Sequence, residues 1–166
     1  MSESTTAIRA AEVITAASAA QLSLATAESL TAGMIAASLA AVPGASAVLM
    51  GGVVSYSSTV KANVLGVDST LLTERGSVDG EVARQMAIGA RNVCGADLAV
   101  SATGVAGPSA HDGKAVGTVF LGFATESDSG FIEQHFSGDR EQIRSASNLA
   151  ALDLFLSHLL PSKHTA

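Results

Sequence analysis

Tryptophan is absent from the 166-residue chain, and tyrosine and cysteine each occur only once. With Cys94 as the only cysteine, neither a disulfide within the chain nor a cysteine-based zinc site can form. The four histidines show no metal-ligand spacing, so we expect no metal and no other cofactor. The core must be largely aliphatic, and the cysteine usage fits a reducing, cytoplasmic location.

Positive charge is also scarce, because nine lysines and arginines face fifteen acidic residues and give a net charge of -6. This balance argues against a nucleic-acid partner, which normally meets a basic face. A small phosphorylated ligand is not excluded, since it needs only one or two cations. Apolar runs are broken by glycine or serine well short of about 20 residues, so we expect no membrane helix. The polar residues 1–6 do not resemble a targeting segment.

Helical and extended patterns alternate along the chain. Apolar residues spaced three or four apart predict helices over residues 6–21, 31–41, 59–65, 80–93 and 140–160. Nearly continuous apolar runs or alternating patterns predict strands over residues 22–27, 47–57, 96–102, 116–125 and 131–137. The last two strands form a hairpin. This order predicts one domain over residues 1–166, a three-layer α/β/α sandwich with a mixed, mostly parallel sheet.

Ser29 lies where a predicted buried strand turns into a helix. In open α/β sheets, ligands bind beyond the carboxyl ends of the strands. A hydroxyl there can point into a cleft, and the nearby helix N-terminus offers N–H groups that stabilise an oxyanion or a phosphate. The alternative is structural: Ser29 or Thr31 caps the helix, and Glu28 is a first-turn carboxylate that suits the dipole.

A serine nucleophile needs a base, and no histidine stands in a triad-like context. Lys61 is the candidate, because it interrupts an apolar helix just after a strand end. It must be desolvated, or lie near another cation, to bring its pKa from about 10.4 to roughly 7 to 8. Tyr56, the only tyrosine, can relay a proton or stack on a ligand. The alternatives are a solvated surface lysine and a tyrosine packed at the rim.

Two further segments follow strands. Residues 103–108 form a glycine-rich turn that allows close approach to a ligand through Thr103, Gly104 and Gly107, or is merely a tight turn. Arg140 and Arg144 open the last helix, where the dipole disfavours cations. Their placement predicts an anionic partner; the alternative is pairing with Asp139 or Glu141. His111 and Asp112 are expected to face solvent.

Taken together, these segments resemble the C-terminal domain of the CinA (competence-damage-inducible) proteins, which also occurs alone as nicotinamide mononucleotide amidase. The similarity extends over nearly the whole chain. The matching stretches are residues 25–33, 42–47, 52–57 with Lys61, 65–67, 96–108, 116–119 and 136–140.

The resemblance implies hydrolysis of the carboxamide of nicotinamide mononucleotide, a small pyridine nucleotide, to nicotinate mononucleotide and ammonia. The resemblance also implies that Ser29 is the nucleophile, that Lys61 is its base and that Tyr56 completes the catalytic group. The substrate-binding residues are expected to be Glu28, Leu30, Thr31, Ala32, Gly33, Thr103, Gly104, Gly107, Arg140 and Arg144.

The chain departs from the family pattern at Leu30, Ala32 and Gly51, where the relatives often have cysteine, glycine and arginine. A second hypothesis is therefore a nucleotide-binding module without turnover. A third is an oligomerisation domain, because small apolar helix surfaces suit subunit packing, and we expect a homo-oligomer. The further N-terminal domain of full-length CinA proteins has no counterpart in these residues, so we expect the stand-alone form.

Overall fold

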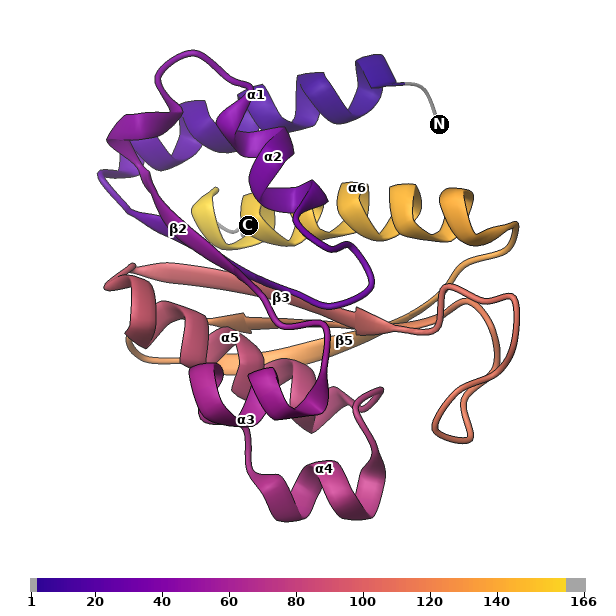
Figure 1. The fold of residues 1–166 in the computed structure, drawn as a ribbon. Coiled ribbons are helices and arrows are strands. Elements are labelled where there is room, and N and C mark those ends of the chain that lie inside the picture. The colour runs from indigo at the N-terminus through magenta and orange to yellow at the C-terminus, as the bar shows by residue number, and fades with distance from the viewer. Residues whose placement is uncertain (1–2, 161–166) are drawn as a thin grey trace, which may run out of the picture.

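The computed structural model describes residues 3–160 (Figure 1). Its helices are α1 (Glu3–Ala20), α2 (Met34–Ala40), α3 (Ser58–Leu65), α4 (Ser69–Arg75), α5 (Gly80–Cys94) and α6 (Arg140–Leu159). Its strands are β1 (Leu24–Glu28), β2 (Leu49–Val54), β3 (Leu98–Gly104), β4 (Thr118–Ala124) and β5 (Ser129–His135). A short 3-10 turn over Ala45–Ala47 precedes β2.

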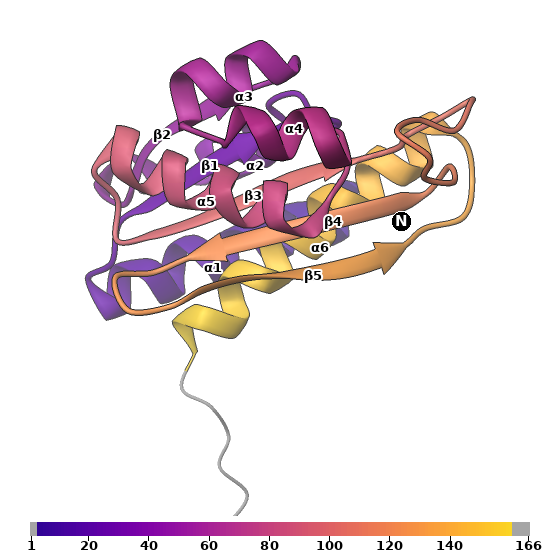
Figure 2. The same cartoon turned by 90° about the horizontal axis from the view of Figure 1, so that it is seen from below.

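The five strands form one sheet in the order β2-β1-β3-β4-β5. β2, β1 and β3 pair in parallel, and β4 runs antiparallel to both of its neighbours, so four strands share one direction. Helices α1, α2 and α6 cover one face of the sheet, and α3, α4 and α5 lie on the other side (Figures 1 and 2). The predicted three-layer sandwich with a mixed, mostly parallel sheet is confirmed.

Aliphatic and small side chains fill both interfaces between the sheet and its helices. The apolar stripe of α1 is buried in full and consists of Ala10, Val13, Ile14 and Ala17. Leu152, Leu156 and Leu159 of α6 are buried, whereas Leu149 is only half-buried. The largest buried side chain below 2 % exposure is not apolar but Lys61.

The segment between β1 and α2 differs from the sequence prediction. Helix α2 begins at Met34 rather than Thr31, because Ala32 and Gly33 adopt left-handed φ angles of 47° and 99° that no right-handed helix accommodates. Ser29 is therefore followed by a turn of four residues before the helix. Glycine adopts such angles freely, whereas the Cβ of Ala32 makes its conformation strained.

Two other local features of the fold concern helix α4 and the glycines of β2. Helix α4 was not predicted; Asp68 caps it, but none of its residues is buried, so it has no apolar stripe to reveal it. The pairing of β1 with β2 shifts register just before Gly51, because Leu24 pairs with Leu49 and Ala25 with Gly51. A Cβ on Gly52 would collide with Oγ1 of Thr26, so only glycine lets the strands approach here.

Within residues 3–160, no helix is both long enough and apolar enough to cross a membrane.

Candidate active site

A cleft of about 360 Å³ opens at the carboxyl ends of β1, β2 and β3. Because these strands are parallel, the residues that follow them meet at one edge of the sheet. The loop after β3 and the start of α6 complete the walls. The lining residues are Ser29, Leu30, Tyr56, Ser77, Val78, Thr103, Gly104, Val105, Ala106, Gly107, Pro108, Ser109, Ala110, His111 and Arg140.

Ser29 and Lys61 are joined by a hydrogen bond. The Nζ of Lys61 lies 2.9 Å from the Oγ of Ser29 and donates a second bond of 2.7 Å to the carbonyl oxygen of Ser55. The side chain of Lys61 is fully buried, so the alternative of a solvated surface lysine is wrong. Ser29 also caps no helix, since the N-cap position of α2 is Gly33, without a side-chain cap bond.

Two features of α3 place Lys61 at this point. Ser57 caps the helix by accepting a bond from the N–H of Val60, which starts α3 directly after the end of β2. Gly89 of α5 packs against the end of α3, where a Cβ would collide with the carbonyl of Leu65. The close approach of α5 fixes the end of α3, and Lys61 on this helix reaches the hydroxyl of Ser29.

Burial lowers the pKa of Lys61 to about 8, and the nearby carboxylate of Asp112 opposes this shift. Desolvation disfavours the ammonium form because its hydration is lost. A lysine with this pKa is neutral in a useful fraction of molecules near neutral pH, as a general base requires. The desolvation expected from the sequence is thus present in the fold.

Glu28 is buried but does not line the cleft. Its carboxylate accepts hydrogen bonds of 2.8 to 3.1 Å from the N–H groups of Gly33, Ile35 and Ala36. It therefore satisfies donors at the start of α2 and suits the positive end of the helix dipole. This is the structural role that the sequence left open for Glu28. Because both carboxylate oxygens already accept these bonds, Glu28 is not available to bind a substrate.

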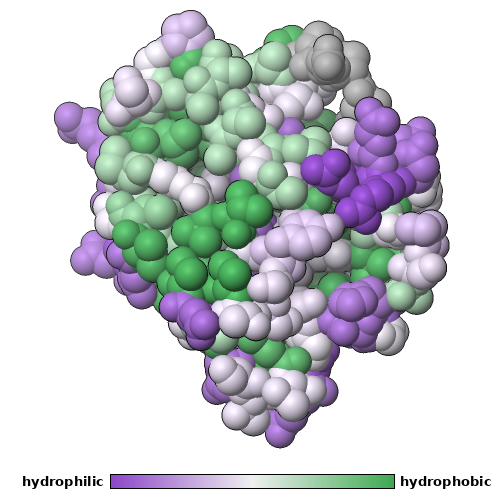
Figure 3. Space-filling model, viewed as in Figure 1, coloured by the Kyte–Doolittle hydropathy of each residue, from purple (hydrophilic) through white to green (hydrophobic). Residues whose placement is uncertain are grey.

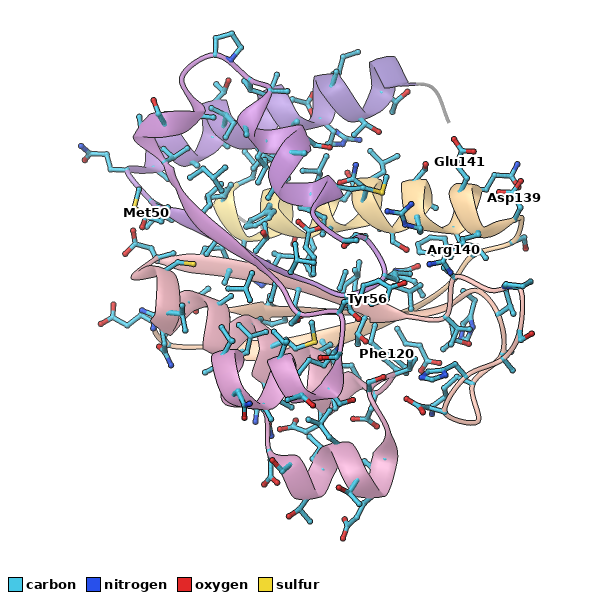
Figure 4. The ribbon with its side chains drawn as sticks, viewed as in Figure 1. Met50, Tyr56, Phe120, Asp139, Arg140 and Glu141 are labelled. Carbon is cyan, nitrogen blue, oxygen red and sulfur yellow. The ribbon has the colours of Figure 1, made fainter. Side chains whose placement is uncertain are left out.

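Tyr56 and Arg140 meet at the mouth of the cleft (Figure 4). Arg140 donates one bond of 2.9 Å to the hydroxyl of Tyr56 and another of 2.9 Å to the carbonyl of Gly107. Arg140 bonds neither Asp139 nor Glu141, so the alternative of pairing with these acidic neighbours is wrong for Arg140. Tyr56 is 59 % exposed and lies at the rim. Figure 3 shows strongly hydrophilic residues on the side of this face where α6 begins.

Arg144 lies one turn further along α6 and does not line the cleft. Its guanidinium instead donates to the carbonyls of Leu30 and Thr31 at 2.8 and 3.4 Å. The alternative of pairing with Asp139 or Glu141 is therefore wrong for Arg144 as well. Of the turn after Ser29, Leu30 faces the cleft, whereas Thr31, Ala32 and Gly33 do not line it.

The glycine-rich segment lies as predicted, because Thr103, Gly104 and Gly107 all line the cleft. The hydroxyl of Thr103 donates to the carbonyl of Ser77 at 2.7 Å, which ties β3 to the loop before α5. Ser77 and Val78 of that loop also line the cleft and were missed. No motif surrounds them in the sequence; only the fold brings them here.

His111 is exposed, as expected, and it also lines the open cleft. Its neighbour Asp112 accepts two hydrogen bonds from Ser77, of 2.6 Å from the N–H and 2.9 Å from the hydroxyl. These bonds fasten the loop after β3 over one side of the cleft. Burial raises the pKa of Asp112, but the bonds from Ser77 outweigh it and lower the pKa overall, so the carboxylate is ionised near neutral pH.

No three His, Cys, Asp or Glu side chains gather into a metal-binding group anywhere in the described part of the chain. A serine hydroxyl bonded to a buried lysine of lowered pKa is an arrangement for nucleophilic attack. Fold and site together define an α/β domain with a serine–lysine pair in a cleft at the carboxyl ends of its strands.

Comparison with known proteins identifies this class further. The family model described as the CinA C-terminal domain matches residues 6–159, and the chain belongs to this family. It is 46% identical over 145 residues to a CinA-like protein of Citrifermentans bemidjiense, covering 87% of this chain and 35% of that protein. A CinA-like protein of Geobacter metallireducens is 44% identical over 140 residues. The chain spans about a third of the length of these curated relatives.

Solved structures of similar proteins share the whole fold. The competence damage-inducible protein A of Klebsiella pneumoniae has a TM-score of 0.90 at 32% identity, covering 97% of this chain and 99% of that one. The competence/damage inducible protein of Agrobacterium tumefaciens has a TM-score of 0.88 at 35% identity, with 92% and 94% covered.

Proposed function

We propose that the protein hydrolyses the carboxamide of nicotinamide mononucleotide to nicotinate mononucleotide and ammonia. The observation that carries this proposal is the hydrogen bond of 2.9 Å between Lys61 and Ser29 at the floor of the cleft. A buried amine beside a hydroxyl can accept its proton, and the activated oxygen can attack an amide carbon. The family resemblance supplies the choice of amide.

In the proposed reaction, neutral Lys61 accepts the proton of Ser29 as the serine oxygen bonds to the carboxamide carbon. The resulting oxyanion collapses, the C–N bond breaks, and the Lys61 ammonium gives its proton to the departing ammonia. Water then attacks the acyl-enzyme ester while Lys61 accepts a proton again. The ester C–O bond then breaks, the Lys61 ammonium returns its proton to the oxygen of Ser29, and the product leaves as the acid and ionises in solution, so the enzyme returns to its starting state.

The mouth of the cleft supports a nucleotide bearing one phosphate. Arg140 is held there by Tyr56 and Gly107, so its cation is preorganised for an anionic group. A volume of about 360 Å³ lies toward the lower end of the range for small-molecule sites, about 300 to 1,000 Å³. It favours a mononucleotide over a dinucleotide. The homo-oligomer expected from the sequence stays a prediction.

The substrate is tested by ammonia release from nicotinamide mononucleotide, nicotinamide riboside and the dinucleotide, with nicotinate mononucleotide identified as the product. We expect the mononucleotide to be turned over fastest and the riboside to show a raised KM, because it has no phosphate for Arg140. The absence of ammonia release from the mononucleotide would overturn the proposal. Nucleotide binding without hydrolysis, measured by calorimetry, would instead support the module without turnover.

A further inference from the structure

The turn between Ser29 and α2 has two backbone N–H groups with no acceptor in residues 3–160, those of Leu30 and Thr31. The other N–H groups nearby are occupied. Ala32 donates to the carbonyl of Ser29 at 3.1 Å, and Glu28 takes the donors of Gly33, Ile35 and Ala36. The carboxylate of Glu28 therefore removes the helix N-terminus itself as an oxyanion site.

The directions of the two free N–H groups are set by their own peptide planes. The N–H of Leu30 shares a plane with the carbonyl of Ser29, which is fixed by the bond from Ala32. The N–H of Thr31 shares a plane with the carbonyl of Leu30, which is fixed by the bond of 2.8 Å from Arg144. In a trans peptide, N–H and C=O point in opposite directions, so the N–H of Thr31 points away from Arg144.

Arg144 does not line the cleft that holds Ser29. It lines a neighbouring hollow between α1, α2 and α6, together with Met34, Ser38 and Asn148. Leu30, in contrast, lines the cleft that holds Ser29. Leu30 thus lies beside the nucleophile in the cleft, while its carbonyl is held by a guanidinium that lines the neighbouring hollow.

We infer that Arg144 is a positioning residue that holds the N–H groups of Leu30 and Thr31 as the oxyanion site for attack by Ser29. The N–H of the residue after a nucleophile supplies such a donor in hydrolases with a strand–turn–helix arrangement. Preorganised donors of this kind act at the transition state and raise kcat rather than substrate affinity. The inference rests on the proposed function, but it concerns the reactivity of Ser29 rather than the identity of the substrate.

The role of Arg144 can be tested without the nucleotide by labelling Ser29 with a fluorophosphonate. The oxygen of Ser29 bonds to phosphorus, fluoride leaves, the proton passes to Lys61, and negative charge develops on the phosphoryl oxygen. The rate of labelling at Ser29 is measured by mass spectrometry for the parent, Arg144→Gln, Arg144→Lys and the control Ser145→Ala, which lines the same hollow. Thermal melting and the pH dependence of labelling are recorded for each.

We expect Arg144→Gln to label at least about tenfold more slowly, since loss of one oxyanion donor costs about 10² to 10³ in rate. Arg144→Lys should be intermediate, the pH midpoint set by Lys61 unchanged, and Ser145→Ala equal to the parent. Labelling of Arg144→Gln at the parent rate overturns the inference, as does slowing accompanied by loss of cooperative melting in both Arg144 variants. A parent that labels but releases no ammonia rejects the proposed substrate alone; a parent unlabelled at Ser29 rejects both proposals.

Discussion

The hydroxyl of Ser29 accepts a hydrogen bond of 2.9 Å from Lys61, a residue 32 positions later in the chain. The two side chains come from the ends of neighbouring parallel strands, β1 and β2, and the short α3 helix turns the lysine back toward the serine. The bond places an amine of lowered pKa on the serine oxygen, and most of the testable consequences follow from that amine.

The activity is expected to rise with pH. Burial lowers the pKa of Lys61 to about 8, and only the neutral amine can accept the serine proton, so kcat/KM should reach half its maximum near pH 8. The carboxylate of Asp112 raises the pKa of Lys61, so Asp112→Asn should move this midpoint to lower pH. Asparagine keeps an acceptor oxygen for the Ser77 bonds.

The pH profile of ammonia release for the parent and Asp112→Asn checks this expectation, with Asp128→Asn, in the turn between β4 and β5, as the control. A flat profile between pH 6.5 and 9 would show that Lys61 does not titrate in the reaction. A midpoint that moves upward in Asp112→Asn would contradict the assigned electrostatics.

The buried ammonium should also make stability depend on pH. Because the pKa of Lys61 is about 8 in the folded chain and 10.5 in its ordinary state, the unfolded chain binds more protons between these values. The buried Lys61 ammonium therefore lowers the free energy of unfolding most below pH 8, and this loss disappears as the pH rises toward 10.5. Between pH 7 and pH 9 the parent should gain about 1 kcal/mol relative to Lys61→Met.

Urea unfolding of both proteins at the two pH values measures this difference directly. Only the change with pH is diagnostic, because Lys61→Met also removes the bonds to Ser29 and Ser55. Equal slopes against pH for parent and variant would exclude the lowered pKa.

Glu28→Gln should destabilise the chain and slow the reaction. The carboxylate of Glu28 receives three backbone N–H donors, and a glutamine would turn an NH₂ group toward some of them. We expect a loss of about 2 kcal/mol in the free energy of unfolding. Ser29 is the next residue, so kcat should fall as well. The exposed Glu74→Gln is the matched control, and an equally small effect of both changes would contradict the capping role.

Tyr56→Phe should weaken substrate binding more than chemistry. It removes the hydroxyl that accepts a bond from Arg140, while Gly107 still holds the guanidinium. Loss of one such bond costs about 1 to 2 kcal/mol, or roughly a fivefold to thirtyfold rise in KM. Steady-state kinetics of ammonia release separate KM from kcat. A fall in kcat alone would place Tyr56 in the proton transfers instead.

Regular elements were predictable because their signals are local. The helix predicted over residues 6–21 depends on the spacing of apolar residues within a few turns, and Ala10, Val13 and Ile14 are buried in the structure as that spacing requires. Helix α4 carries no buried residue, so its sequence had no pattern to detect. The left-handed Ala32 was equally invisible, since alanine favours the right-handed helix that was predicted for it.

The site was predictable in part for the same reason. Ser29, Lys61 and Arg140 follow strand ends, which a parallel sheet gathers at one edge. The roles of Glu28 and Arg144 depend on which atoms their side chains reach, and those partners lie on a turn whose course the sequence did not indicate. Long-range packing thus decides that Glu28 caps a helix and that Arg144 holds backbone carbonyls, although both were predicted to bind the substrate.

The measurement that tests the central claim most directly is the rate of ammonia release from nicotinamide mononucleotide by Ser29→Ala and Lys61→Met, beside the parent and the control Ser157→Ala on α6. If Ser29 is the nucleophile and Lys61 its base, both variants should lose at least about 10³-fold in kcat while still melting cooperatively, because members of such a pair act as a unit. Ser157→Ala should match the parent. Turnover by Ser29→Ala or by Lys61→Met at the parent rate would contradict the mechanism.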